Sequence, residues 1–406
     1  MAAVAGSGSG VAAPLAPAAG VAPEGRVLVV GTGVVGLCAA LGAAQRGLRV
    51  SLVGPVPRPA STAAFDARIY ALSEGARALL EAQRVWPQVD ARRCSPVARM
   101  RIFGDAGGAL AFDALAAGAS RLATIVEETQ LLQALWLACS LSPNIEHLPL
   151  AFDSLEPTPT GAQVRLSGGT LRAASLVLGA DGRESAVRAA AGIRVRRRAY
   201  GHTAIVANFS TRQPHHEQAQ QWFTDEGIVA LLPLPGAAVS LVWSAPQELA
   251  PALLALEADA FARRVALRCG LAPDTLAVLG PPQSFVLERL VVERLVGPGL
   301  ALMGDAAHVV HPLAGQGLNL GLQDVADFLR LLDAREPWRA LGDRVFLRRY
   351  DRARAEPIAL MRTTVDTLAG LFGTPDARVR RLRNLGLSAV NAVAPLKHAL
   401  VRHALG

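Results

Sequence analysis

The chain has 406 residues, of which 51% are hydrophobic and 18% are charged. This length exceeds the usual size of one domain, and the composition excludes an intrinsically disordered protein because enough apolar surface is available for a core. The net charge of +8 comes almost entirely from arginine, since Lys397 is the only lysine. Aromatic residues make up only 5%, and no helix-turn-helix or RNA-binding signature is present, so we predict no nucleic-acid partner.

The cysteines and the N-terminal segment indicate the class of protein. Cys38, Cys94, Cys139 and Cys269 form neither a CxxC pair nor a dense disulfide framework, which is typical of buried thiols in a reducing cytosol. No metal site is predicted. Residues 1–25 are nearly all Ala, Gly, Pro, Ser and Val, which predicts a flexible tail and does not fit a secretory signal. We therefore predict a cytoplasmic protein.

The first regular element expected is a buried strand over residues 26–30, followed at once by the motif GTGVVG, a helical segment and a second strand. This arrangement predicts a Rossmann-like dinucleotide-binding domain. Gly31 allows the tight turn, Gly33 lets backbone N–H groups approach a pyrophosphate, and Gly36 lets the helix pack closely on the strand. The uncharged run 27–44 is long enough for a membrane span, but its three glycines favour the buried unit.

The second strand of such a domain normally ends in Asp or Glu, which binds the ribose hydroxyls of the nucleotide. This chain has Gly54 at that position. Either another group reaches the ribose, or the nucleotide binds more weakly than usual.

Two downstream segments also have the character of nucleotide-binding strand ends. A buried strand ending at Gly179 runs into GADGRESAVR, which places Asp181 in a tight turn before a helix. Another strand ends at Gly304 and Asp305 and leads through a glycine-rich loop into a helix around Gly317. A carboxylate at a strand end can bind a sugar-type hydroxyl, and a helix N-terminus can stabilise negative charge on a flat ring.

With these three motifs, the chain resembles the FAD-dependent aromatic-ring hydroxylases, and most closely the ubiquinone-biosynthesis hydroxylase family. The segments DARIYALS (66–73), IVEETQLLQAL (125–135) and the tail 383–406 are also similar to that family, and the block 304–324 is the most specific part. The resemblance implies an FAD-dependent monooxygenase with NAD(P)H as electron donor and O2 as co-substrate. It implies hydroxylation of a polyprenyl phenol or quinone precursor through a flavin hydroperoxide.

The resemblance also assigns residues to the cofactor. Asp305 is expected near the ribitol and pyrophosphate, and residues 315–319 near the edge of the isoalloxazine ring. Arg68 is expected to lie along the nucleotide and to compensate for Gly54. The complete predicted FAD-binding set is Gly31, Gly33, Val34, Val35, Gly36, Arg68, Gln130, Asp181, Gly304, Asp305, Pro312, Gly315, Gly317, Leu318 and Asn319.

His308 and His311 are the candidate catalytic residues, because histidine can change its charge near neutral pH. In one interpretation, one of them orients the substrate ring or assists deprotonation of a phenol. In the other, which the frequency of structural hydrogen bonds favours, they hold the loop through bonds to the backbone.

A second, antiparallel sheet is expected to cover the flavin. Its predicted strands are a hairpin over 100–112 and the segments 202–209, 220–234, 238–244 and 284–292. The candidate substrate-pocket residues are Trp222, Leu231, Leu232 and Pro233. Most aromatic side chains on strands are expected to belong to the core, so the proline-broken strand end at Leu231–Leu234 is favoured as the pocket wall.

After Asp324 the chain is expected to be helical. Basic residues alternate with Leu, Val and Ala over 378–403, which is typical either of a helix on a membrane surface or of a helix that packs on the protein with a basic outer face. The first alternative would make this a peripheral protein of the inner membrane, where a prenylated substrate resides. The resemblance also raises an assembly with other quinone-biosynthesis proteins.

Together these elements predict an α/β protein with two interleaved domains. The predicted divisions are a tail (1–25), a Rossmann-like FAD-binding domain (26–96, 114–195 and 293–335), an antiparallel-sheet substrate domain (97–113 and 196–292) and a C-terminal helical region (336–406). Two other functions stay open at this point. One is an FAD-dependent prenyl-lipid oxidoreductase that transfers no oxygen, and the other is a non-catalytic flavin-binding subunit.

Overall fold

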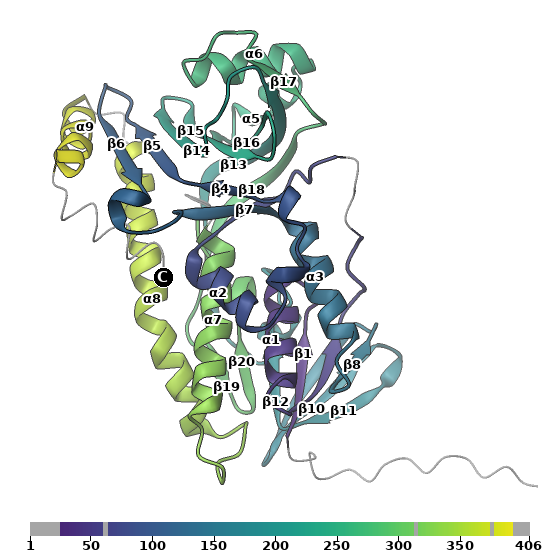
Figure 1. The fold of residues 1–406 in the computed structure, drawn as a ribbon. Coiled ribbons are helices and arrows are strands. Elements are labelled where there is room, and N and C mark those ends of the chain that lie inside the picture. Colours follow the sequence, from purple (N-terminus) through teal and green to yellow (C-terminus); the bar gives the residue numbers. More distant parts are fainter. Residues whose placement is uncertain (1–24, 60–63, 312–315, 374–376, 393–406) are drawn as a thin grey trace, which may run out of the picture.

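The structure is a computed structural model that describes residues 25–59, 64–311, 316–373 and 377–392 (Figure 1). The predicted tail lies outside the described residues except for Gly25, as do Pro312, Gly315 and the end of the basic segment 378–403. Cys38, Cys139 and Cys269 are buried, Cys94 is half-buried, and all four are free thiols.

A six-stranded sheet lies at the centre of the N-terminal domain, in the order β19-β20-β12-β1-β2-β8. Its strands are β1 (Arg26–Val30), β2 (Arg49–Val53), β8 (Ile145–Leu148), β12 (Leu176–Gly179), β19 (Val296–Gly297) and β20 (Leu300–Leu302). From β20 to β8 every pairing is parallel. Such strands are covered on both faces, which explains the continuous apolar runs by which the sequence revealed them.

Helices cover this sheet. α1 (Val34–Ala44) begins directly after the glycine-rich turn and packs against α3 (Glu128–Ser140) and α7 (Gln316–Asp333). α8 (Arg344–Gly373) packs on α7 and continues up beside the second domain (Figure 1). The remaining helices are α2 (Glu74–Ala82), α4 (Ala186–Ala190), α5 (Ala250–Leu254), α6 (Ala258–Arg268) and α9 (Ala377–Ala392).

The second domain is built on a nine-stranded sheet in the order β21-β18-β13-β16-β15-β14-β5-β6, with β17 paired to β13. Its strands are β5 (Arg99–Phe103), β6 (Ala109–Asp113), β13 (Val195–Thr211), β14 (Gln218–Thr224), β15 (Gly227–Leu234), β16 (Ala238–Pro246), β17 (Leu276–Val278), β18 (Gln283–Val292) and β21 (His308–Val309). All pairings are antiparallel except that of β14 with β5. The predicted α/β fold with an antiparallel second sheet is confirmed.

Two small sheets connect these parts. The first is β3 (Ile69–Leu72), β7 (Ala123–Glu127) and β4 (Ser95–Val97), and the second is β9 (Phe152–Thr158), β10 (Gly161–Leu166) and β11 (Leu171–Ala174). The first of them brings the DARIYALS segment next to the start of α3, because β3 pairs with β7 and α3 follows β7 directly.

The prediction of one strand over 220–234 is wrong. The chain reverses at Asp225 and Glu226, and β14 and β15 pair antiparallel on either side. Gly227 has a φ of +100°, and a Cβ added there would lie 2.0 Å from the carbonyl oxygen of Ser244. The reversal therefore depends on glycine, whose missing side chain permits both the positive φ and the close approach of β16.

The nine-stranded sheet has two different faces, because successive side chains of a strand point in opposite directions. One face carries Ile205, Phe209, Leu241 and Trp243, and these side chains form a core with helices α5 and α6. The other face carries smaller apolar side chains and looks toward the N-terminal domain. The alternation thus separates a packed core from a surface that can bind a ligand.

The glycine-rich turn after β1 has the predicted geometry. Gly31 has a φ of +117°, and a Cβ there would lie 2.2 Å from the carbonyl oxygen of Ala180. A Cβ on Gly36 would lie 2.1 Å from the carbonyl oxygen of Gly31. These two glycines therefore permit close contact between α1, β1 and the strand end of β12.

We predict that Gly36→Ala lowers the free energy of unfolding by about 2 kcal/mol, because overpacking at a tight helix–strand contact forces backbone shifts. Urea denaturation followed by circular dichroism measures this. Gly280→Ala is the matched control, because a Cβ at Gly280 meets nothing within 4 Å. Equal stability of the two variants would contradict the packing role of Gly36.

Candidate active site

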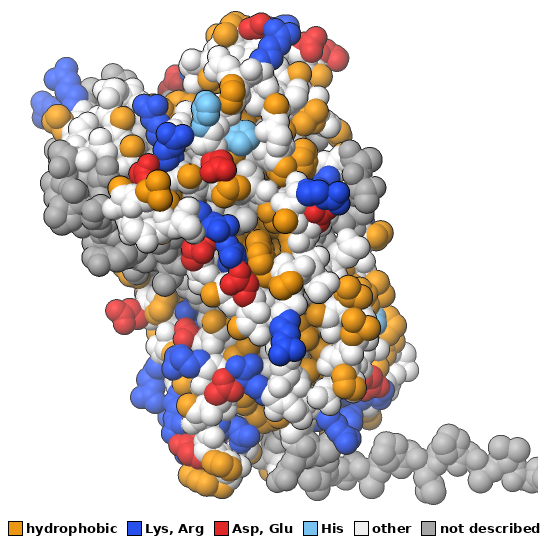
Figure 2. Space-filling model, in the orientation of Figure 1, with side chains coloured by type: hydrophobic (Ala, Val, Ile, Leu, Met, Phe, Trp, Pro, Cys, Tyr) orange, Lys and Arg blue, Asp and Glu red, His pale blue; other side chains and the backbone are white. Residues whose placement is uncertain are grey.

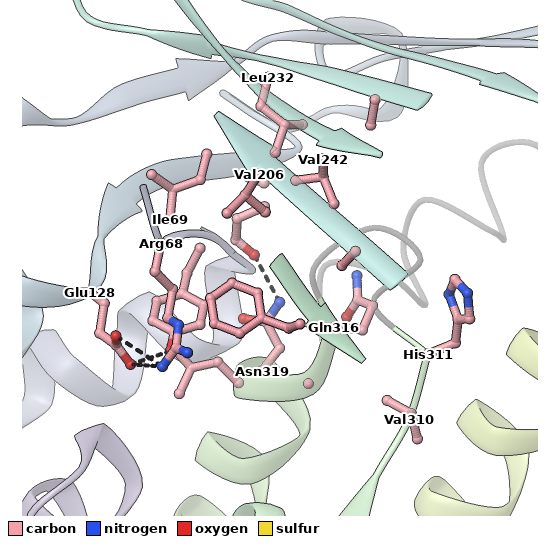
Figure 3. A pocket seen from close by; sticks show the side chains of 18 of the residues that line it. Arg68, Ile69, Glu128, Val206, Leu232, Val242, Val310, His311, Gln316 and Asn319 are labelled. Atoms are coloured by element: carbon pink, nitrogen blue, oxygen red, sulfur yellow. Dashed lines mark hydrogen bonds and ion pairs between the residues drawn. The ribbon is translucent and has the colours of Figure 1, made fainter. Parts of the chain in front are cut away.

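A cavity of about 800 Å³ lies between the two domains. The N-terminal domain contributes the glycine-rich turn, the strand end at Asp305 and the start of α7, and the nine-stranded sheet contributes its small apolar face. In Figure 3, Val206, Leu232 and Val242 lie on the sheet side, and Arg68 and Asn319 lie on the other side. The cavity therefore joins a polar wall to an apolar wall.

The polar wall includes the N-terminus of α1. Gly33 is the N-cap residue, and a Cβ added to it would meet nothing within 4 Å. Val34 and Val35 follow it along the cavity. The first N–H groups of a helix have no partner within the helix, and the helix dipole places positive charge there. This end of the cavity is suited to an anion such as a pyrophosphate.

Asp305 follows β20, and its side chain is exposed to the cavity. The surrounding protein deprives this carboxylate of bulk water, which raises its pKa. Gly304, directly before it, lies behind the cavity wall with its N–H donated to Asp324 Oδ2 at 2.8 Å. The hydrogen bond between Gly304 and Asp324 thus fixes the backbone that carries Asp305.

Asp324 is fully buried and has several partners. His308 Nε2 lies 2.7 Å from Asp324 Oδ2, and Arg354 Nε donates to Asp324 Oδ1 at 2.7 Å. Burial opposes ionisation of this carboxyl, but His308 and Arg354 outweigh it and lower its pKa. His308 does not line the cavity, which favours the interpretation that it holds the loop. It is not placed to touch a substrate.

His311 does line the cavity, although it is only 2% exposed. Its Nε2 lies 3.2 Å from Ser244 Oγ, and its ring meets Tyr200 edge-on with the ring centroids 4.8 Å apart. Burial, followed by the nearby His202, lowers the pKa of His311 to about 4. The imidazole is therefore neutral near pH 7 and is a weak base there, so hydrogen bonding to a ligand is the more suitable role.

Arg68 reaches the cavity from the segment before β3. Its Nη1 lies 3.2 Å from Glu128 Oε2 (Figure 3). Its guanidinium lies 4.9 Å from the ring centroid of Phe285. Tyr70 donates its hydroxyl to Glu128 Oε1 at 2.7 Å. If Arg68 contacts a nucleotide, its guanidinium would therefore bind the nucleotide and the Glu128 carboxylate at the same time.

The segment that carries Arg68 is held from both domains. Glu127 is buried, accepts the N–H of Asp66 at 2.5 Å and forms an ion pair with Arg93 at 2.6 Å. Asn208, on β13 of the second domain, donates to the Asp66 carbonyl oxygen at 2.9 Å. These contacts fix the backbone two residues before Arg68.

The predicted FAD-binding residues fall into four groups. Those that line the cavity are Gly33, Val34, Val35, Arg68, Asp305, Gly317, Leu318 and Asn319. Those that lie behind the wall and shape it are Gly31, Gly36 and Gly304. Asp181 and Gln130 do not line the cavity, and Pro312 and Gly315 lie outside the described residues.

Asp181 and Gln130 have other surroundings than predicted. Asp181 accepts hydrogen bonds from Ser185 Oγ at 2.5 Å and from the N–H of Val187 at 3.1 Å, so it fixes the start of α4. On α3 the residue that faces the cavity is Glu128, two positions before Gln130. Residues two apart on a helix point in different directions, which accounts for this correction.

The side chain of Asn319 also does more than line the wall. Its Oδ1 accepts the N–H of Ser73 at 3.0 Å, and its Nδ2 donates to the carbonyl oxygen of Ala71 at 2.8 Å. It thereby joins α7 to the end of β3, which the sequence did not indicate.

Of the four predicted substrate-pocket residues, one lines the cavity. Leu232 lines the cavity, whereas Leu231 points to the opposite face and packs in the core beside α6. Trp222 stacks on Phe103 with the ring centroids 5.4 Å apart, and neither Trp222 nor Pro233 lines the cavity. The alternation of side chains along β15 places the adjacent residues Leu231 and Leu232 on opposite faces of the sheet.

Several cavity residues were not found from the sequence. They include Tyr70, Arg183, Gln221, Ser244 and Phe285. The sequence pattern singles out neither Gln221 nor Ser244, because β14 reads QAQQWFT and β16 reads AVSLVWSAP, and neither has a polar residue at every second position. For Tyr70 and Phe285 no local signal distinguishes a cavity residue from a core residue.

Comparison with known proteins identifies the family of this chain. Residues 24–361 match the FAD binding domain family. The chain is 35% identical to the ubiquinone hydroxylase UbiL of Rhodospirillum rubrum, covering 94% of this chain and 89% of that protein. It is 34% identical to the 3-demethoxyubiquinol 3-hydroxylase of Escherichia coli, covering 94% and 98%.

The chain belongs to the FAD-dependent ubiquinone-biosynthesis hydroxylase family. This hydroxylase is therefore a flavoprotein monooxygenase with FAD as cofactor, and NAD(P)H and O2 are typical co-substrates of the class. Its fold is also that of PqsL from Pseudomonas aeruginosa, with a TM-score of 0.75, 24% identity and coverage of 89% of this chain and 99% of that one. The p-nitrophenol 4-monooxygenase PnpA of Pseudomonas putida has a TM-score of 0.75 at 16% identity, with coverage of 94% and 98%.

The structure explains why this hydroxylase has Gly54, and not Asp or Glu, at the end of the second strand. Gly54 has a φ of +146°, and a Cβ there would lie 3.0 Å from Thr32 Cγ2. Thr32 is held in place because its hydroxyl donates to the Pro55 carbonyl oxygen at 2.7 Å. A side chain at position 54 is thus disfavoured both by backbone conformation and by space.

We predict that Gly54→Asp does not tighten FAD binding and lowers thermal stability, because the new side chain meets Thr32 at a strained φ. Titration of apo-protein with FAD and a thermal melt measure the two effects. Gly47→Asp is the control, since Gly47 also has a positive φ of +79° but has nothing within 4 Å. Tighter FAD binding by Gly54→Asp than by the wild type would contradict this account.

Proposed function

We propose that this hydroxylase oxygenates the aromatic ring of a polyprenyl phenol or quinone precursor in ubiquinone biosynthesis. The observation that carries the proposal is the single cavity, which joins the nucleotide-type strand ends to an apolar sheet wall. The names of the relatives from Rhodospirillum rubrum and Escherichia coli support the pathway. A third relative is the mitochondrial ubiquinone biosynthesis monooxygenase COQ6 of Drosophila melanogaster, at 31% identity with coverage of 85% of this chain and 80% of that protein.

The residues on the polar wall fit FAD. The open N-terminus of α1 after Gly33 would hold the pyrophosphate, and the Asp305 carboxylate would accept a hydrogen bond from a ribityl hydroxyl. The N–H groups near Gly317, at the start of α7, would stabilise negative charge at the flavin edge. When bound, FAD supplies the redox chemistry with O2, and NAD(P)H supplies the electrons. The protein positions the substrate and excludes water.

The cavity also suits a long apolar substituent. Where β4, β5, β6 and the residue before β7 form its wall, the lining side chains are Val97, Met100, Phe112 and Leu122. None of these four can donate or accept a hydrogen bond of ordinary strength, so this part favours a hydrocarbon chain. An aromatic head near the cofactor wall would leave the prenyl tail along this part.

Deletion of the gene in its own host tests the proposal. We expect a prenylated phenol lacking one oxygen to accumulate and ubiquinone to fall, because the ring can no longer be hydroxylated. Mass spectrometry of isoprenoid-quinone intermediates measures both, and the wild-type gene supplied in trans is the control. An unchanged quinone pool, also in a strain without any redundant hydroxylase, would contradict the proposed substrate.

We also propose a peripheral contact with an anionic membrane through α9. Its inner face docks on the β5–β6 hairpin, since Arg383 pairs with Asp105 and Asn384 Oδ1 accepts the N–H of Gly108 at 3.0 Å. Its outer face carries exposed side chains at three- and four-residue spacing: Arg378, Arg381 and Leu385. Leu385 is 66% exposed, so its side chain is available to the apolar part of a membrane surface.

Two further observations bear on membrane contact. Within the described part of the chain, no helix is long and apolar enough to cross a membrane. On the face shown in Figure 2, basic and acidic side chains alternate instead of gathering in one basic patch. The proposed contact therefore depends on the outer face of α9 and its few arginines.

Flotation with liposomes tests the membrane contact. We expect the wild type to float with vesicles containing phosphatidylglycerol, and the double variant Arg378→Glu/Arg381→Glu to stay in the soluble fraction because its charge repels the lipid. Arg92→Glu/Arg212→Glu, with equal change of charge at two other exposed arginines, is the control. Flotation of both double variants alike would contradict the assignment to α9.

A further inference from the structure

Gln220 and Gln221 both line the apolar wall of the cavity, and of these two polar residues Gln221 is the buried one, whereas Gln220 is half-buried. Gln221 lies on β14, is 6% exposed, and lines the cavity. Its side-chain amide makes no hydrogen bond to any other residue that the structure describes. The small accessible part of this side chain opens into the cavity.

The neighbours of Gln221 on the same face offer it no hydrogen-bonding group. Ala219 and Phe223 precede and follow it on that face of β14, Ala230 lies opposite on β15, and Ile102 lies opposite on β5. All four side chains are apolar. A primary amide surrounded in this way has two N–H donors and one carbonyl acceptor that the protein does not satisfy.

The other buried polar side chain on this wall is in a different situation. Ser244, on β16, has its hydroxyl 3.2 Å from His311 Nε2. The amide atoms of Gln221 are accessible from the cavity, so a ligand that covered them without a polar group would leave them buried and unsatisfied, at a cost of about 1–3 kcal/mol. The position of Gln221 is therefore best explained by a ligand that completes its hydrogen bonds.

We propose that Gln221 is a specificity-determining residue whose side-chain amide binds an oxygen substituent on the aromatic ring of the substrate. The amide both donates and accepts, so it suits a phenol hydroxyl or a hydroxyl beside an ether oxygen. The surrounding alanines leave room for the ring next to β14 and β15. This inference rests on the proposed function, since it names how that substrate is recognised.

The test compares two probes on the FAD-loaded enzyme, 2-geranylphenol and geranylbenzene, which differ by one oxygen. Perturbation of the flavin absorbance gives the dissociation constant of each. We expect the wild type to bind the phenol about tenfold more tightly, because the hydrocarbon leaves the amide without a partner. In Gln221→Leu this preference should fall to about twofold or less, mainly through weaker binding of the phenol.

Gln218→Leu is the matched control. Gln218 is the same residue type on the same strand, but its side chain points to the opposite face of β14 from Gln221 and does not line the cavity. The tenfold preference for the phenol should therefore remain in Gln218→Leu. FAD content and melting temperature establish that each variant is folded. Should Gln221→Leu fail to retain FAD, Gln221→Met gives the same comparison with an unbranched side chain.

The outcomes separate the inference from the function on which it rests. An undiminished preference in the Gln221 variant overturns the inference, as does equal binding of both probes by the wild type. In those two cases binding of a prenylated aromatic still supports the proposed function. If the wild type binds neither probe, the proposed substrate class and the inference both fail.

Discussion

The buried carboxylate of Asp324 is the group on which the centre of this hydroxylase depends. It accepts the N–H of Gly304 at the end of β20, lies against His308 on β21, and pairs with Arg354 on α8. Arg354 in turn donates to the carbonyl oxygen of Leu320 and pairs with Asp327. One carboxylate therefore ties together the strand end that presents Asp305, the following loop and two helices. Removing one partner from such a pair leaves an uncompensated buried charge, which typically costs about 3–5 kcal/mol.

The cavity follows from this arrangement and from the two faces of the nine-stranded sheet. The face that carries Trp243 packs on α5 and α6, so it is unavailable to a ligand. The opposite face carries small side chains such as Ala204, Ala230 and Val242, and a layer of small side chains leaves space beneath it. The glycine-rich turn, Asp305 and the start of α7 form the opposite wall of that space. Beside it, Val365 of α8 packs in one cluster with Phe223 of β14. The result is one site in which a flavin and an apolar substrate can meet.

Much of the N-terminal domain was predictable because its signals are local. The run RVLVV, the glycines at 31, 33 and 36, and the block from Gly304 each act within a few residues, and the structure has them at the positions expected. The substrate domain was less predictable. The turn at Asp225 and Glu226 contains neither proline nor a standard two-residue hairpin sequence, so 220–234 resembled one strand. The pocket prediction also named the adjacent residues Leu231 and Leu232, which lie on opposite faces of β15. Which of two adjacent side chains faces a cavity is decided by the partner strands and layers, which the local sequence does not show.

The amino-acid sequence by itself determined the glycine-rich turn and the buried strands of the N-terminal domain, because a glycine that must approach another backbone, or a run that must be buried, is recognisable without its partners. Its motifs also carried the resemblance that implied the family and the cofactor. Only the tertiary structure decided the roles of side chains that depend on distant partners. His308 meets Asp324 and therefore holds the loop, Glu128 rather than Gln130 faces the cavity, and Gln221 lies alone among apolar neighbours from two other strands. Hydrogen bonding and burial are properties of pairs of residues brought together by folding, and the spacing of residues along one chain does not contain them.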